Sequence, residues 1–106
     1  MQVSFQYCED CPSHEQALER LQRVLQEERV RVKLEVVEVQ TDEQAKHLHF
    51  IGSPTILIDS KDIDPPSCSS YSAGACRVYK LDDGRISPLP SEDMIRRAVR
   101  AAMENP

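Results

Sequence analysis

Two cysteines separated by two residues, Cys8 and Cys11, stand between a strand pattern and a helix pattern. Residues 3–7 alternate apolar and polar side chains, with the period of two that is typical of a strand. Residues 17–25 carry apolar side chains at the spacing of one helix face. Pro12 and the Ser13/Gln16 capping box both favour a helix start within one turn of Cys11.

This placement has chemical consequences for the dithiol. Two intervening residues allow a disulfide to close within the first helical turn. The free N–H groups and positive dipole end of the helix favour a thiolate, which is the reactive form in disulfide exchange. Glu9 and Asp10 lie between the two cysteines and are expected to oppose thiolate formation at Cys8.

The middle of the chain predicts a second strand and a second helix. Residues 30–36 alternate apolar and charged side chains, and the phase changes over 37–39, which indicates a bulge or burial on both faces. Thr41 and Gln44 form a capping box that opens a short helix through about Leu48.

The C-terminal half predicts two further strands and a helix. Gly52-Ser53-Pro54 breaks the chain before a compact apolar strand at 55–58, and residues 59–75 read as a long irregular stretch. Residues 76–81 read as the last strand, and Ser91 caps a final helix with a regular apolar stripe. We therefore predict one α/β domain over residues 1–106 in the order β-α-β-α-β-β-α, with a four-stranded mixed sheet flanked by helices and the first two strands parallel.

Composition restricts the partners. The chain has 106 residues and a formal net charge of −5, so it offers no basic stripe for nucleic acid. No stretch is long and apolar enough to cross a bilayer, and residues 1–7 lack the basic and apolar regions of a secretion signal. We expect a cytoplasmic protein with mostly reduced cysteines, no membrane partner and no cofactor.

The dithiol and a later proline carry a family resemblance. Tyr7-Cys8-Glu9-Asp10-Cys11 after a strand, with Ser53-Pro54-Thr55 opening a later strand, resembles the thioredoxin and glutaredoxin superfamily. The resemblance implies that Cys8 attacks, that Cys11 resolves the mixed disulfide, and that Pro54 is a cis-proline facing the dithiol. Substrate contacts would then fall on Pro54 and on four neighbours of the site: Tyr7, Pro12, Ser53 and Thr55. The partner would be a protein or small-molecule thiol or disulfide.

A narrower resemblance changes the emphasis. Cys11-Pro12, Gly52-Ser53-Pro54-Thr55 and Ala75-Cys76-Arg77-Val78-Tyr79 are similar to a group of small thioredoxin-like proteins, some labelled alkylmercury-lyase-like. In that group the cysteine before proline often lacks a Cys-x-x-Cys partner, which would make Cys11 the central thiol. The lyase activity itself does not follow, because a fold does not fix a function.

Metal binding is the rival interpretation of the cysteines. A zinc site from Cys8, Cys11, Cys68 and Cys76 fits poorly, because seven residues separate the last two. Cys8 and Cys11 alone suit a soft ion such as Cu(I) or Hg(II), as in a metal carrier. A non-catalytic adaptor with a vestigial dithiol is a third alternative.

Other polar residues leave alternatives open. Cys68 and Cys76 either form a disulfide or second redox pair, or are a loop thiol and a buried strand thiol. His14 either tunes Cys11 or is a solvated residue near the helix start. The polar face of the first strand, with Gln2, Ser4 and Gln6, is either partly covered by the short second helix or meets another subunit.

Overall fold

The structure is a computed structural model that describes residues 1–9, 14–64, 77–81 and 83–104. Seven residues named above lie outside the described residues: Asp10, Cys11, Pro12, Ser13, Cys68, Ala75 and Cys76.

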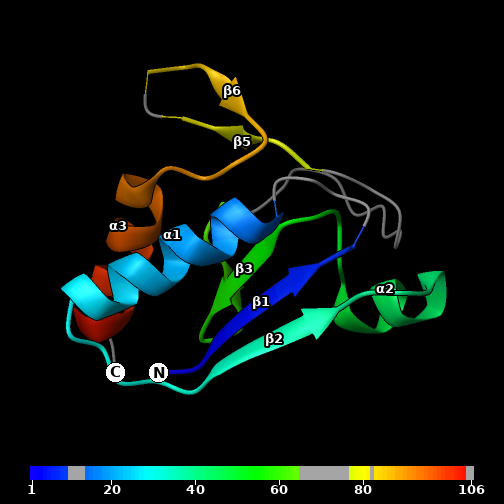
Figure 1. Ribbon diagram of the computed structural model, residues 1–106, viewed down its shortest axis with the longest axis horizontal. Coiled ribbons are helices and arrows are strands. Elements are labelled where there is room, and N and C mark those ends of the chain that lie inside the picture. Colours follow the sequence, from blue (N-terminus) through cyan, green and yellow to red (C-terminus); the bar gives the residue numbers. More distant parts are fainter. Residues whose placement is uncertain (10–13, 65–76, 82, 105–106) are drawn as a thin grey trace.

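A four-stranded mixed sheet forms the centre of the molecule (Figure 1). The strand order is β2 (Leu34–Glu38), β1 (Val3–Tyr7), β3 (Thr55–Ile58) and β4 (Lys61–Asp62). As predicted, β1 and β2 are parallel, and β3 is antiparallel to both β1 and β4. This arrangement is compatible with a thioredoxin-like fold.

The helices lie on different parts of the sheet (Figure 1). The two long helices, α1 (His14–Glu27) and α3 (Glu92–Glu104), cover the same face. Their apolar stripes pack with Val3, Phe5 and Ile56 of the sheet in one core cluster. These stripes are the ones that the spacing of apolar residues predicts. Burial of the apolar faces against the sheet stabilises both helices.

The short helix α2 (Asp42–Leu48) lies at the carboxyl end of β2 (Figure 1). The predicted cap is present, because the Thr41 hydroxyl accepts a hydrogen bond from the Gln44 N–H at 3.1 Å. Ala45 of this helix packs with Val39 and Phe50 in a second, smaller core cluster.

The face of the sheet opposite α1 and α3 is only partly covered. Gln6 is buried there, and its side-chain oxygen has no hydrogen-bond partner in the described part of the chain. A hollow of about 690 Å³ remains on this face, with Leu48 of α2 among its lining residues. Leu48 of α2 therefore reaches this face, and contact of the face with another subunit stays a prediction.

Two strand predictions were wrong in their bounds. The second strand begins at Leu34 rather than residue 30, and its pairing with β1 runs through Glu38 without a bulge. Val39 follows the strand and is buried in the smaller core cluster. The apolar pattern therefore shifts where the chain passes from the main sheet to this second cluster.

The fourth strand of the main sheet is Lys61–Asp62, not residues 76–81. Asp59 and Ser60 both have positive φ (52° and 68°), and this conformation at two successive residues reverses the chain directly after β3. Part of the range 76–81 forms β5 (Tyr79–Lys80), which pairs with β6 (Ile86–Ser87) in a separate two-stranded sheet. In Figure 1 this hairpin lies at the top of the view, above α1, and the main sheet lies below α1.

Candidate functional site

Cys8 follows directly after β1. On one side of β1, the Tyr7 carbonyl accepts a hydrogen bond from the Val39 N–H at 2.7 Å, so the chain is bonded to the segment after β2 up to the residue before Cys8. On the other side, β1 pairs with β3 in a register that joins Gln6 to Thr55. Because the strands are antiparallel, the end of β1, where Cys8 follows, and the start of β3, where Pro54 precedes, lie at the same end of the sheet. The sheet therefore brings the first cysteine and the proline turn to one end of the molecule, although they are 45 residues apart in the chain.

Cys8 is only 5% exposed. Reactive cysteines are usually more accessible than this, whereas buried ones are usually inert. The burial therefore restricts what can approach this sulfur.

The proline turn is buried as well. The peptide bond between Ser53 and Pro54 is cis, as predicted. Ser53 is fully buried and Thr55 is 2% exposed, and the Thr55 hydroxyl donates to the Gly52 carbonyl at 2.6 Å. The predicted substrate contacts at Ser53 and Thr55 thus lie inside the protein rather than on an open surface.

Two residues that the sequence did not single out as site residues hold this turn in place. The Arg77 N–H donates to the Ser53 carbonyl at 3.1 Å, and the Tyr79 hydroxyl donates to the Pro54 carbonyl at 2.5 Å. Tyr79 is fully buried, and this burial raises the pKa of its hydroxyl above the ordinary range, against the opposing effect of the Arg77 charge. The hydroxyl therefore stays a hydrogen-bond donor at neutral pH.

Arg77 is itself anchored. Its guanidinium forms an ion pair with Asp62 at 2.6 Å and donates to the Asp64 carbonyl at 2.7 Å. It also lies over the Tyr79 ring, 4.3 Å from the centroid, in a cation–π contact. The side chains of Arg77 and Asp62 are 6% and 14% exposed, so solvent screens this ion pair weakly.

Tyr7 and His14 form an aromatic pair beside Cys8. Their ring centroids are 4.6 Å apart and the rings are nearly parallel, at 11°. Tyr7 also contacts Phe5 of the core. His14 is therefore not a fully solvated residue, because its ring is stacked against the end of the strand that carries Cys8.

The family comparison covers nearly the whole chain. A model described as a domain of unknown function, DUF2703, matches residues 1–99. The chain belongs to the DUF2703 family. It matches no curated protein and no solved structure.

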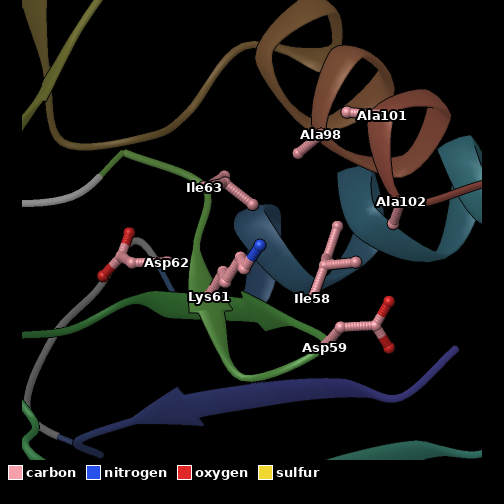
Figure 2. Close-up of a pocket in the computed structure, with 8 residues that line it drawn as sticks. All are labelled: Ile58, Asp59, Lys61, Asp62, Ile63, Ala98, Ala101 and Ala102. Atoms are coloured by element: carbon pink, nitrogen blue, oxygen red, sulfur yellow. The ribbon is translucent and has the colours of Figure 1, made fainter. Parts of the chain in front are cut away.

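The described part of this DUF2703 protein has a cavity of about 270 Å³ away from Cys8 (Figure 2). It lies between α3 and the β3–β4 turn, where Ile58 and Ile63 point toward Ala98. None of the described residues that line it is a cysteine or a histidine.

Among the described residues, no three His, Cys, Asp or Glu side chains are grouped so that they could hold a metal ion. No helix in the described ranges is long and apolar enough to span a membrane.

Only an alternation of apolar and polar side chains could have indicated from the sequence that Arg77 and Tyr79 point inward. Within residues 76–81, apolar side chains occur at both odd and even positions, so the inward face is ambiguous. The structure buries Arg77 and Tyr79 and leaves Val78 59% exposed. From the sequence alone, Val78 rather than Arg77 would be expected to point inward, because arginine is rarely buried without a partner.

Proposed function

We propose that this DUF2703 protein is a thiol–disulfide oxidoreductase of thioredoxin-like fold that uses Cys8 and Cys11 beside the cis-proline Pro54. The observation that supports this most directly is the pairing of β1 with β3, which puts Cys8 and the cis Ser53–Pro54 bond at the same end of the two strands. A dithiol at a strand end, followed by a helix and facing a second buried turn, is a suitable arrangement for exchange chemistry.

Helix α1 supports the same chemistry. It begins at His14, three residues after Cys11. The start of the helix is therefore close in sequence to both thiols. The stacked rings of Tyr7 and His14 join the start of this helix to the end of β1, directly before Cys8 in the chain.

The exchange reaction has two steps. In the order that the resemblance implies, the Cys8 thiolate attacks one sulfur of a disulfide R–S–S–R, forms a mixed disulfide and releases RS⁻. The Cys11 thiolate then attacks the Cys8 sulfur, releases the second RS⁻ and closes the Cys8–Cys11 disulfide. The protein dithiol gives up two electrons and two protons, and a second dithiol such as dithiothreitol restores it.

A redox titration tests the proposal. The purified protein is equilibrated in buffers with different ratios of reduced to oxidised dithiothreitol, alkylated, and analysed by peptide mass spectrometry. We expect one reversible two-electron transition between Cys8 and Cys11. The matched control is the double variant Cys68→Ser/Cys76→Ser, which should keep the transition.

Single substitutions test the order of attack. Cys11→Ser should trap a mixed disulfide on Cys8, and Cys8→Ser should trap none. If Cys8 and Cys11 never pair at any ratio, the exchange function is wrong.

Soft-metal binding is the second candidate, because a 5% exposed sulfur suits a retained ion with few ligands. Stoichiometric binding of Hg(II) or Cu(I), lost in Cys8→Ser and accompanied by no exchange activity, would favour it. The proposal includes a cytoplasmic location, where thiols are kept reduced, and no nucleic-acid partner.

A further inference from the structure

Among the described residues at the Cys8 end of the sheet, the backbone carbonyls of the proline turn are already hydrogen-bonded. An extended polypeptide that brings its disulfide to Cys8 needs acceptors for its own N–H groups, as in strand addition. The pairing of β1 with β3 puts Cys8 and the Ser53–Pro54 turn at the same end of the two strands. The carbonyls of this turn are the acceptors that such a polypeptide would meet.

Each of the three carbonyls from Gly52 to Pro54 accepts a hydrogen bond from within the chain. The Gly52 carbonyl accepts from Thr55 Oγ1 at 2.6 Å. The Ser53 and Pro54 carbonyls accept from the Arg77 N–H at 3.1 Å and the Tyr79 hydroxyl at 2.5 Å. Ser53 is fully buried, so no surface remains there for a second backbone.

The segment that makes these bonds is firmly held. Arg77 is fixed by the ion pair with Asp62, by the Asp64 carbonyl and by the Tyr79 ring. An incoming polypeptide would have to displace this segment and leave a buried guanidinium without its partners, which is costly. A small disulfide makes no such demand, because it needs only access to a sulfur.

We propose that the segment Arg77–Tyr79 occupies the position of a partner backbone, so that the dithiol exchanges with small-molecule disulfides and excludes polypeptides. This inference rests on the proposed exchange function and specifies its substrate class.

Two substrates compared on the same protein test this inference. Oxidation of the reduced protein is followed by stopped-flow mixing with bis(2-hydroxyethyl) disulfide and, separately, with insulin. We expect a second-order rate constant at least tenfold higher for the small disulfide than for insulin. Equal rate constants, or faster reaction with insulin, would overturn the inference and leave the exchange function intact. If neither disulfide oxidises Cys8 and Cys11, the exchange function itself fails, and the inference fails with it.

Variants connect the selectivity to the segment. Asp62→Asn removes the charge partner of Arg77 and should raise the ratio of insulin rate to small-disulfide rate severalfold. The matched control is Asp83→Asn, which breaks the exposed pair with Arg85 and should leave both rates unchanged. Should Asp62→Asn fail to fold, Arg77→Lys keeps the positive charge but loses the forked contacts with Asp62 and the Asp64 carbonyl, and it should move the ratio in the same direction. An unchanged ratio in a folded variant would show that this segment does not exclude polypeptides.

Discussion

Replacing Tyr79 by phenylalanine is a direct test of how the proline turn is held. The substitution keeps the buried ring and the cation–π contact with Arg77 but removes the hydroxyl that donates to the Pro54 carbonyl at 2.5 Å. A buried acceptor left without its donor costs about 1–3 kcal/mol. We therefore expect the free energy of unfolding to fall by about 1–3 kcal/mol, since Tyr79 is fully buried and water does not replace the lost donor.

Urea denaturation followed by circular dichroism measures this change. The slope of unfolding free energy against urea should stay constant, because the surface exposed on unfolding is the same. Tyr7→Phe is the matched control, because Tyr7 is half-buried and its ring packing is retained. A loss of less than about 0.5 kcal/mol in Tyr79→Phe, the range of ordinary surface substitutions, would refute the reasoning.

The free energies of unfolding of wild type and Tyr79→Phe should also depend differently on pH in the alkaline range. Burial raises the pKa of Tyr79 in the folded protein, whereas the unfolded chain releases this proton near pH 10. Above that pH the folded state binds one more proton than the unfolded state, so the free energy of unfolding decreases as pH rises, by about 1.4 kcal/mol per pH unit. Below about pH 10 the contribution is fully present.

The measurement is urea denaturation of wild type and Tyr79→Phe between pH 8 and pH 11. The stability difference between the two proteins should shrink above about pH 10. A difference that stays constant across this range would contradict a raised pKa at this position.

Three further substitutions follow from the described contacts. Asp62→Asn breaks the weakly exposed ion pair with Arg77 and should lower the unfolding free energy by about 3–5 kcal/mol in urea denaturation, and an effect that disappears in high salt would argue against a buried pair. Thr41→Ala removes the cap of α2 and should cost about 1 kcal/mol, with Thr41→Ser restoring most of it; equal losses in both variants would argue against capping. Leu21→Ala opens a cavity in the main core and should cost about 2–5 kcal/mol by thermal denaturation, whereas Met103→Ala, at a half-exposed side chain, should cost far less; similar losses would contradict the assigned core.

Much of the local structure was readable from the sequence. The stripes of α1 and α3, the Thr41 cap and the Ser91 cap, whose hydroxyl accepts from the Met94 N–H at 3.1 Å, all follow from patterns within one helical turn. The strand at 3–7 is long enough to show its period of two, and the strand at 55–58 is marked by an apolar run after a chain break. The Ser53–Pro54 cis bond was expected from the resemblance that the surrounding residues carry.

Which segments meet was decided by the tertiary structure. A strand of two residues, such as Lys61–Asp62, is too short to show a period, so only its pairing with β3 identifies it. The inward direction of Arg77 depends on the partners Asp62 and Asp64, more than a dozen residues earlier. Burial of Cys8 depends likewise on segments far away in the chain. The sequence by itself determined the helices, the longer strands and the dithiol motif, because their signals are local. Only the tertiary structure decided strand partners, burial and the bonds around Pro54, because those depend on contacts between distant residues.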